Sequence, residues 1–379
     1  MSDKVRPLGV GVVGSGIISE IYLQNMIHRF DILDVKGLCS AHMENAKRRA
    51  DQFGIPARTY EELLADESVE LIVNLTPTPA HEGIICRALE AGKHVYTEKT
   101  MTTGHGSARA LADLAKSKGL WLGSAPDTFL GAGWQTARRA IDEGLIGEVT
   151  SFAFAANRDN SVLTSFFRFL NLPFGGVAYD YSVYYFTALC SLLGPVARVA
   201  AAVRAPYPTH VDIDPRSATC GQEISTPNES EVSAVITLKS GVSGTAHVNA
   251  DSVLEDQHFF AIYGTKGILY LPDPNGFGGE VRLQPNWHFT EQPAPARVLE
   301  SAFGYADNSR GLGPAELAWS VRAGRPNRAS ADMACHVLEV IDAIIESGKT
   351  NAFVEIDSTF ERPRPLVESD GDEEGSIRQ

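Results

Sequence analysis

Apolar runs of strand length alternate with segments of helical periodicity through the first third of the chain. A first strand begins at Leu8 and runs into a glycine turn that opens a helix. Further strands are predicted at Leu33–Cys39, Val69–Leu75, His94–Glu98 and Leu120–Ser124, and helices at Asn45–Phe53, His81–Ala91 and Ser107–Lys118. Such alternation is typical of a parallel sheet with crossover helices. Five strands are thus located, and because six complete this class of domain, we expect a doubly wound α/β domain with six strands over residues 1–124.

The pattern changes in the second half of the chain. Six segments are predicted as strands, at Val149–Ala156, Ala197–Arg204, Val232–Leu238, Gly244–Ala250, Phe259–Tyr263 and Ile268–Leu271. Short turns at 239–241 and 264–267 join neighbouring strands directly, so this sheet should be mostly antiparallel. Helices are predicted at Trp134–Glu143, Tyr179–Leu193, Pro314–Ala323 and Ala331–Ser347. We expect an α+β domain with an open sheet over 125–366, followed by a disordered acidic tail at 367–379.

Composition narrows the class of protein. The 379 residues are 44% hydrophobic and 21% charged, as in a globular protein with two domains. The formal net charge of -14 argues against a nucleic-acid partner. The five cysteines are scattered and never spaced as a metal-binding pair, so neither disulfides nor a metal site is expected. Because the chain shows neither a signal peptide nor a membrane-spanning run, we expect a cytoplasmic protein without a membrane partner.

The glycine turn after the first strand is a candidate dinucleotide site. In the segment Gly14-Ser15-Gly16-Ile17-Ile18-Ser19, Gly14 would allow a tight turn and Gly16 would let the backbone approach a pyrophosphate. Ser19 is small enough for close packing of the helix on the strand, and the helix directs its amide dipoles at the phosphates. Glycine turns also occur for conformational reasons alone, so the motif gains weight only from the residues at the later strand ends.

The end of the second strand bears on the choice of cofactor. An acidic residue about 20 residues beyond the glycine turn would hold the ribose of NAD, but the chain has Ser40 and His42 there. Both could accept a 2'-phosphate, helped by Lys47 or Arg48. The sequence therefore favours NADP slightly and leaves NAD open.

Two later strand ends carry further polar residues. Thr76, Pro77, Thr78 and His81 come after a buried strand, where a cofactor edge would pass, although Thr78 and His81 would also serve as helix caps. The next strand ends in Glu98-Lys99, which places a lysine at the cofactor crevice.

Several of these motifs together resemble the glucose-fructose oxidoreductase / inositol dehydrogenase family, also written Gfo/Idh/MocA. The resemblance spans nearly the whole chain and rests on Gly14-Ser15-Gly16, Thr76 to His81, Ala91 to Lys99, Gly175 to Asp180, Ala125 to Gly131, Arg310 to Gly313 and Gly324 to Pro326. It implies NAD(P)-dependent oxidation or reduction of a hydroxyl or ketone on a sugar, polyol or related carbocycle. The folds it implies are an N-terminal Rossmann dinucleotide-binding domain and a C-terminal mostly antiparallel open-sheet domain.

The resemblance assigns three catalytic candidates. The family's Glu-Lys-Pro lysine corresponds to Lys99, with Thr100 in place of proline, and its second motif corresponds to Asp180 and Tyr184, with tyrosine in place of histidine. If Asp180 lies in a helix, Tyr184 occupies the same face four residues on. A nearby Lys99 ammonium would favour the phenolate, so Tyr184 could accept the substrate proton as hydride leaves. Lys99 would stabilise the developing charge, and Asp180 would orient the substrate.

Other assignments compete with these. The stretch 179–186 is rich in aromatic residues, which usually belong to a core, and Tyr185 is the rival of Tyr184. Four residues are plausible on the substrate side by placement in loops, although each is more often part of an ion pair: Asp127, Arg158, Arg168 and His258. Residues 158–173 depart from what the resemblance leads us to expect, so substrate identity is most open there.

We therefore predict an NAD(P)-dependent oxidoreductase acting on a sugar, sugar derivative or cyclitol. One alternative uses the same residues for redox-assisted glycoside cleavage, by C3 oxidation, elimination and return of the hydride. A second alternative is a regulator that binds dinucleotide without chemistry. Because an antiparallel sheet backed by helices on one face leaves the other face available, we also expect a homodimer or homotetramer.

Overall fold

The computed structural model divides the chain into two compact units. It describes all residues except 1–4, 253–257, 288–291, 293, 369–372 and 379. The first unit comprises residues 1–132, 302–335 and 363–379, and the second comprises residues 133–301 and 336–362. The late segments therefore belong partly to the N-terminal unit. The domain boundaries predicted after residues 124 and 366 stay predictions.

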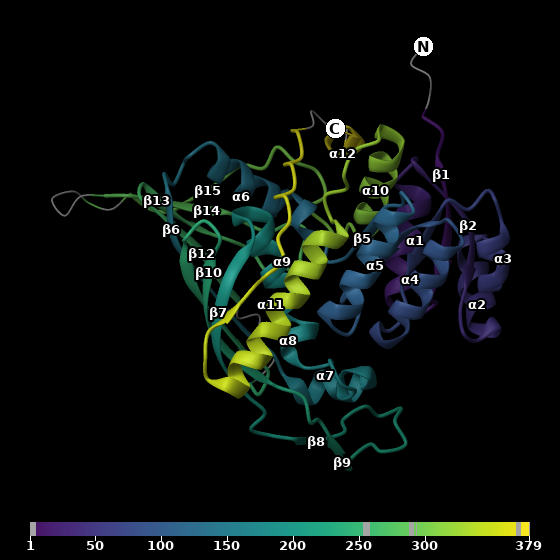
Figure 1. The fold of residues 1–379 in the computed structure, drawn as a ribbon, viewed down its shortest axis with the longest axis horizontal. Coiled ribbons are helices and arrows are strands. Elements are labelled where there is room, and N and C mark those ends of the chain that lie inside the picture. The colour runs from purple at the N-terminus through teal and green to yellow at the C-terminus, as the bar shows by residue number, and fades with distance from the viewer. Residues whose placement is uncertain (1–4, 253–257, 288–291, 293, 369–372, 379) are drawn as a thin grey trace. The chain divides into compact units, whose positions relative to one another are not determined.

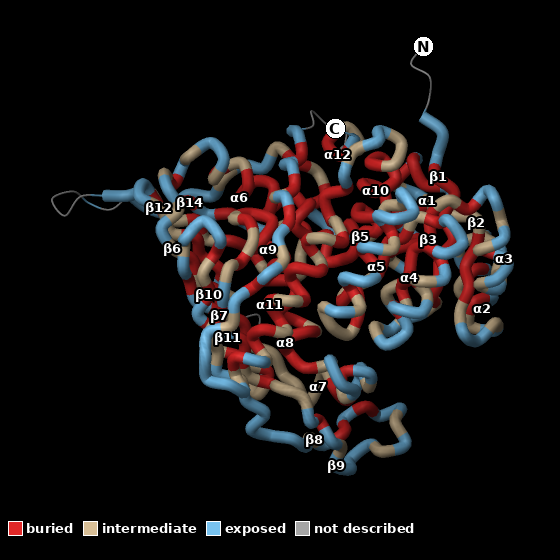
Figure 2. Tube along the Cα trace, in the orientation of Figure 1, coloured by how far each residue is buried: buried red, intermediate tan, exposed pale blue. Residues whose placement is uncertain are grey.

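The first unit is built on a parallel sheet with the strand order β2-β1-β3-β4-β5, of which Figure 1 labels β1, β2 and β5. The strands are β1 Leu8–Val13, β2 Leu33–Cys39, β3 Leu71–Asn74, β4 His94–Thr97 and β5 Leu122–Ser124. Every residue of β1 and β3 is buried, and both strands lie in the red interior of Figure 2. The predicted parallel α/β class is confirmed.

The count of six strands was wrong for the described part of this unit. On the edge of β2 away from β1, the described residues make a single parallel bridge, between Leu38 and Ala57. The reason is the short space available, because α2 ends at Gly54 and Thr59 already caps α3 through a capping box. The few residues between them, which include Pro56, leave no room for a full strand.

Helices surround this sheet and fill the crossovers. Their bounds are α1 Ile18–His28, α2 Met43–Phe53, α3 Tyr60–Ala65, α4 His81–Glu90 and α5 His105–Ser117, with α10 Leu312–Ala323 and α12 Glu373–Arg378 added from late in the chain. Helix α10 contacts β4 and β5.

The acidic end of the chain differs from the disordered tail that was expected. Residues 373–378 form α12, in which Ile377 is fully buried. Arg325 donates to the carbonyl oxygen of Ile377 at 2.6 Å, and the Arg378 guanidinium lies 4.9 Å from the ring of Trp319. The run of charged residues in the sequence therefore obscured one buried apolar residue, Ile377. The part of the predicted tail at 369–372 and 379 lies outside the described residues.

The second unit contains a nine-stranded sheet, ordered β15-β14-β13-β12-β6-β11-β10-β7-β16. Its strands are β6 Val149–Asn157, β7 Val196–Arg204, β10 Glu231–Leu238, β11 Ser243–Asn249, β12 His258–Gly264, β13 Gly267–Tyr270, β14 Arg282–Pro285, β15 Arg297–Val298 and β16 Val354–Glu355. All pairs are antiparallel except β6 with β11. The mostly antiparallel sheet is thus confirmed, and all six predicted strands are present.

The helices of this unit are α7 Asn160–Phe166, α8 Val177–Asp180 and α9 Ser182–Leu193, together with α6 Ala132–Asp142 from residue 133 onward and α11 Ala331–Thr350 from residue 336 onward. The single helix predicted at 179–193 was wrong, because the chain breaks at Tyr181 between α8 and α9. A two-stranded hairpin, β8 Thr209–Val211 with β9 Glu223–Ser225, also lies between β7 and β10 and was not predicted.

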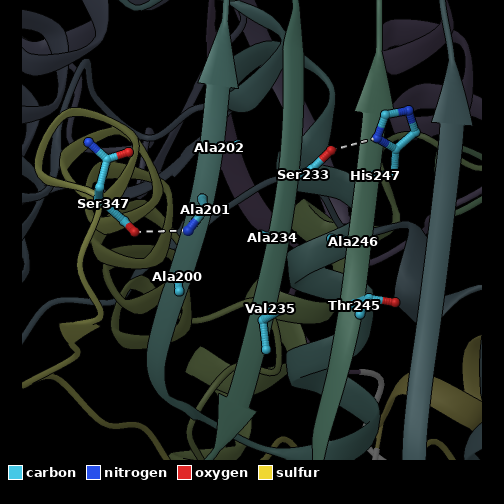
Figure 3. A pocket seen from close by; sticks show the side chains of 11 residues that line it. Ala200, Ala201, Ala202, Ser233, Ala234, Val235, Thr245, Ala246, His247 and Ser347 are labelled. Carbon is cyan, nitrogen blue, oxygen red and sulfur yellow. Dashed lines mark hydrogen bonds between the residues drawn. The ribbon is translucent and has the colours of Figure 1, made fainter.

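The two faces of the nine-stranded sheet differ in character. Phe154 of β6 contacts Phe186 of α9 at 5.5 Å between ring centroids, so α9 packs on that face. On the opposite face, β10 presents Ser233 and Val235 and β11 presents Thr245 and His247, around the open hollow of Figure 3. Among the described residues, no helix combines the length and apolar character needed to cross a bilayer.

Candidate active site

The glycine turn after β1 needs its first glycine for two reasons. Gly14 has φ +111°, a conformation that side chains rarely adopt, and a Cβ there would lie 2.7 Å from the carbonyl of Leu75. Its N–H donates to the carbonyl of Cys39 at 2.8 Å. Ser19 is fully buried and donates to the carbonyl of Gly16 at 2.6 Å. The turn is therefore tied to β2 on one side and to the loop after β3 on the other.

The second glycine leaves the approach to the turn open. A Cβ on Gly16 would have no atom within 4 Å, and helix α1 begins two residues later at Ile18. Ser15 and Ile18 are not buried, and Ile17 is 79% exposed. An accessible backbone at a helix N-terminus suits a pyrophosphate, so these residues fit a dinucleotide.

The end of β2 presents polar and basic residues. Ser40 is half-buried and His42 is exposed at the start of α2. Lys47 pairs with Glu44 at 3.3 Å and Arg48 donates to Asn45 at 3.2 Å, and both side chains lie on the exposed part of α2. Residues 39–43 include no acidic side chain that would hold a ribose.

A set of buried hydrogen bonds joins the ends of β3 and β4. Asn74 donates to the hydroxyl of Thr97 at 3.0 Å, and the hydroxyl of Thr76 donates to the Asn74 side-chain oxygen at 2.8 Å. His81 is fully buried, with Nε2 2.7 Å from the carbonyl of Thr76 and Nδ1 2.8 Å from that of Thr100. Burial lowers the pKa of His81. His81 thus holds two strand ends together from inside the unit.

The residues after β4 are held by main-chain and side-chain contacts. The peptide bond between Lys99 and Thr100 is cis. Glu98 accepts from the hydroxyl of Tyr22 at 2.7 Å and from the backbone N–H of Lys99 at 3.0 Å. Burial, and then the charge of Glu98, raise the pKa of Tyr22. The Thr78 hydroxyl lies 3.5 Å from the Lys99 carbonyl. These hydrogen bonds fix the backbone from which the Lys99 side chain extends.

The structure places Asp127 inside the first unit. Its side chain is 2% exposed and accepts from the N–H of Gly313 at 2.6 Å, at the start of α10. Burial raises the pKa of Asp127 to about 6, against the opposing effects of the Gly313 N–H and the charge of Arg310. The charge of Glu98 also raises this pKa.

In the second unit, Asp180 and Tyr184 lie on either side of the break at Tyr181. Asp180 is the last residue of α8 and is half-buried, while Tyr184 belongs to the first turn of α9 and is 8% exposed. The N–H of Tyr184 donates to the carbonyl of Tyr181 at 3.2 Å. The premise that both residues share one continuous helix was therefore wrong. The rival, Tyr185, is fully buried and stacks on Phe260, which suits a core residue.

Arg158 comes directly after β6 and lies over an aromatic ring. Its guanidinium carbon is 4.3 Å from the ring centroid of Tyr181, and its Nε is buried without a hydrogen-bond partner. Burial raises the pKa of Tyr181 to about 12, and Arg158 opposes that shift. The ring of Tyr181 lies 6.2 Å from that of Tyr184. The structure thus brings Arg158 close to the α8–α9 break, while His258 lies on β12, paired with Ala156.

Arg168 is occupied by the β8–β9 segment. Its guanidinium donates to the buried carboxylate of Asp212, to the hydroxyl of Ser217 at 2.9 Å and to that of Thr219 at 2.8 Å. The hydroxyls of Ser217 and Thr219, with the Arg168 charge, hold the pKa of Asp212 down to about 2. These contacts hold two loops together, and we refer to such a set of side-chain contacts between segments as a clasp.

Sequence reasoning missed the partners of the candidate residues. Tyr22 meets Glu98 across 76 positions, and Asp212 meets Arg168 across 44. Neither Tyr22, in an ordinary helical pattern, nor Asp212, in a polar loop, carries a local signal for such a contact. The described residues also hold no group of three or more His, Cys, Asp or Glu placed to bind a metal.

Two models of one protein family match the chain. Residues 8–125 match the model described as the oxidoreductase family with an NAD-binding Rossmann fold, and residues 134–270 match the GFO/IDH/MocA C-terminal domain.

Curated relatives agree with these matches. The chain is 29% identical to an uncharacterised oxidoreductase of Schizosaccharomyces pombe over 52% of this chain and 54% of that protein. The chain thus spans about half the length of this relative, and less than two thirds of the length of some others. It is 26% identical to D-xylose 1-dehydrogenase (NADP(+)) 2 of Haloferax volcanii over 92% of this chain and 98% of that protein.

Solved structures show the same fold. Levoglucosan dehydrogenase in complex with NADH and levoglucosan superposes with a TM-score of 0.80 at 20% identity, covering 93% of this chain and 100% of that one. At this identity the likeness bears on the fold alone.

Proposed function

Because the chain belongs to the Gfo/Idh/MocA oxidoreductase family, whose N-terminal domain is an NAD-binding Rossmann fold, we propose that it transfers hydride between NAD(P) and a sugar or cyclitol. The reacting group is a hydroxyl or ketone of the sugar, sugar derivative or cyclitol. The observation that carries the proposal is the arrangement at the carboxyl edge of the parallel sheet. There the open glycine turn comes after β1, and the fixed Glu98-Lys99 pair comes after β4. Ligands of open α/β sheets bind at this edge.

Three side chains have proposed roles in the reaction. When bound, the nicotinamide ring supplies the hydride acceptor or donor. Lys99 holds the reacting oxygen and stabilises negative charge that develops on it. Tyr184, as a phenolate, accepts the proton of that hydroxyl and becomes a phenol, and Asp180 accepts a hydrogen bond from a neighbouring hydroxyl and so orients the ring. Asp127 and Arg168 are less suited to the substrate roles predicted from the sequence, because Gly313 and the Asp212 loop already occupy them.

The cofactor is proposed to be NADP more readily than NAD. Ser40 and the exposed His42 occupy the position where a carboxylate would repel a 2'-phosphate, and Lys47 and Arg48 lie on the adjoining helix. Replacing Ser40 by Asp should lower the affinity for NADP and raise that for NAD. Cofactor titrations of the wild type and this variant test the assignment, and equal affinities in both proteins would contradict it.

The experiment that tests the function monitors reduced-nicotinamide absorbance with NAD or NADP. D-xylose, scyllo-inositol, levoglucosan and aryl glycosides are the substrates, and Lys99→Ala and Tyr184→Phe are the variants. Signal that both variants lose supports the proposal. Release of aglycone without reduced cofactor supports redox-assisted glycoside cleavage instead. Cofactor binding without either product supports a dinucleotide-binding regulator.

We also propose that copies of the chain associate through the outer face of the nine-stranded sheet. Val235 is 45% exposed there, beside Thr245 and His247, which line the open hollow. A charge in the centre of such a contact should separate the copies, because it would be buried without a partner. Light scattering of the wild type and Val235→Glu tests this: a monomeric wild type would contradict the proposal.

A further inference from the structure

The second glycine of the pair before α8 has no conformational reason to be glycine. Gly176 has φ -70° and ψ 169°, an extended backbone that any residue adopts. A side chain at Gly176 would instead meet the carboxyl group of Glu229, which would have to move. A Cβ on Gly176 would lie 2.1 Å from the carboxyl carbon and from Oε1, and 2.3 Å from Oε2. Gly176 therefore makes room for one particular side chain, far along the sequence.

Glu229 uses this room to hold the first turn of α8. Its carbonyl oxygen accepts from the N–H of Val177 at 3.0 Å, and its Oε1 accepts from the N–H of Ala178 at 3.2 Å. The first N–H groups of a helix have no partner within the helix, so these two bonds satisfy groups that would otherwise need water. Burial raises the pKa of Glu229, which agrees with a carboxyl group seated inside the turn.

Two further contacts hold α8 on other sides. The hydroxyl of Tyr179 donates to Asp342 of α11 at 2.7 Å, and the hydroxyl of Ser182 donates to the carbonyl of Val177 at 3.0 Å. Asp180 is the last residue of this short turn. A movement of the first turn therefore changes where the Asp180 carboxylate lies, since only four residues form α8.

Glu229 is itself anchored by its neighbours in the chain. Asn228 donates to the carbonyls of Leu170 and Leu172 at 2.8 and 2.7 Å. On the other side, the N–H of Ser230 donates to the carbonyl of Arg204 of β7 at 3.0 Å. The segment 228–230 thus joins the sheet, the loop at 170–172 and the start of α8.

We propose that Glu229 is a positioning residue that fixes Asp180 for the reaction by holding the first turn of α8. This inference rests on the proposed function, in which Asp180 orients the substrate. Glu229 acts through the backbone of Val177 and Ala178, and Gly176 is its necessary partner.

The test uses full-length protein with two independent readouts. Hydrogen exchange of peptides that cover 176–184 reports on the turn, and steady-state kinetics on whichever of D-xylose, scyllo-inositol or levoglucosan is turned over reports on the reaction. Glu229→Ala should speed exchange in those peptides and lower kcat/KM about tenfold, because small misplacements of orienting groups are costly. Glu229→Gln should keep most activity, since its amide oxygen still accepts from Ala178. Cofactor affinity should stay unchanged in both.

Further variants distinguish loss of the contacts between Glu229 and α8 from a general loss of folding. Gly176→Ala should reproduce the loss of Glu229→Ala, because the methyl group displaces the carboxyl group. The double variant should be no worse than either single one. Glu223→Ala, an exposed glutamate of β9 in the same segment of chain, is the matched control and should leave kinetics and exchange unchanged. If Glu229→Ala does not fold, Glu229→Asp makes the same test, since its carboxylate is too short to reach Ala178.

The outcomes that overturn the inference are distinct. Faster exchange with unchanged kinetics would show that Glu229 only packs the turn, and unchanged exchange would show that it does not hold the turn. Additive losses in the double variant would contradict the pairing of Gly176 with Glu229. A wild type without turnover on any substrate would remove the proposed function and the positioning role with it, while exchange would still decide whether the clasp exists.

Discussion

The two units hold their candidate residues in different ways. In the first unit, the candidates come after neighbouring parallel strands and are fixed largely through backbone atoms. Gly14 donates to Cys39, Glu98 donates through its N–H to the carbonyl of Asn74 at 2.8 Å, and His81 lies between two carbonyl oxygens. In the second unit, Asp180 and Arg168 lie in short turns, and side chains distant in sequence hold these segments. Glu229 and Asp342 hold α8, and Asp212 holds Arg168.

This difference indicates which contacts in the two units depend on the identity of a side chain and which do not. Backbone contacts at strand ends depend little on side-chain identity. We therefore expect substitutions in the cofactor-binding part of the first unit to be tolerated, except where neighbouring atoms approach closely. The side-chain contacts in the second unit depend on one or two residues each. Replacing those residues should therefore alter the proposed substrate-binding segments without disturbing the sheet. We therefore expect variants of the first unit to remove cofactor binding or turnover, and variants of the second unit to alter rate or stability in part.

The largest effect should come from Lys99→Ala. Loss of the group proposed to stabilise charge on the reacting oxygen should lower kcat by about a thousandfold, while cofactor affinity stays near that of the wild type. Lys116→Ala, which removes an exposed lysine paired with Asp332, is the control and should keep full activity. Turnover retained in Lys99→Ala would assign the chemistry to other residues.

A matched pair of glycine variants should divide folding from cofactor binding. Gly14→Ala places a methyl group against Leu75 at a positive φ and should cost about 1–3 kcal/mol of stability. Gly16→Ala meets no atom within 4 Å, so its stability should change by less than about 0.5 kcal/mol. Cofactor should nevertheless stop raising the melting temperature of Gly16→Ala. Equal behaviour of the two variants in melting curves would contradict the assignment of the turn.

Arg168→Ala sharpens the comparison on the substrate side. If Arg168 is a clasp, its loss leaves the buried Asp212 carboxylate without a guanidinium partner, and the unfolding midpoint should fall by about 2–4 °C. KM should stay unchanged. Arg216→Ala is the control, because its side chain is 73% exposed and pairs with Asp214. A raised KM at unchanged stability would restore Arg168 as a substrate contact.

The smallest effect concerns the pH dependence that Asp127 adds. Its pKa of about 6 lies above the ordinary value near 3.9, so the folded state binds a proton more tightly than the unfolded chain. Stability from this group therefore rises as pH falls through 6, by about 1 kcal/mol between pH 7.5 and 5. Asp127→Asn should lack this gain when denaturant unfolding is measured at both values. An equal pH response in the two proteins would show that Asp127 titrates normally.

Asp212 of the second unit provides a contrast of opposite sign. The pKa of Asp212 is depressed to about 2, so its stabilising contribution is present above about pH 4 and is lost as pH falls toward 2. Asp127 and Asp212 thus respond to acid in opposite directions, because burial is the largest effect on the pKa of Asp127, whereas hydroxyls and a guanidinium together outweigh burial at Asp212.

Features that follow from local sequence patterns and from the order of the strands could be predicted from the sequence alone. The glycine turn, the ends of β3 and β4, and six strands of the second sheet reflect local patterns of apolar residues and glycine, so they could be predicted. The partners of the candidates could not, because Glu229 and Asp342 lie 51 and 163 positions from the residues they hold. The break at Tyr181 was also hidden, since an aromatic run fits one continuous helix as well as two. The burial of Ile377 could not be predicted either, because the residues around it are mostly charged.

The most direct test of hydride transfer tracks the hydrogen itself. A carbon-deuterated form of whichever sugar is turned over is incubated with oxidised cofactor, and the reduced cofactor is analysed by mass spectrometry. Our account predicts a reduced nicotinamide that carries one deuterium and a ketone or lactone product. Product formed with the deuterium retained on its own carbon skeleton, and with no labelled cofactor accumulating, would contradict it.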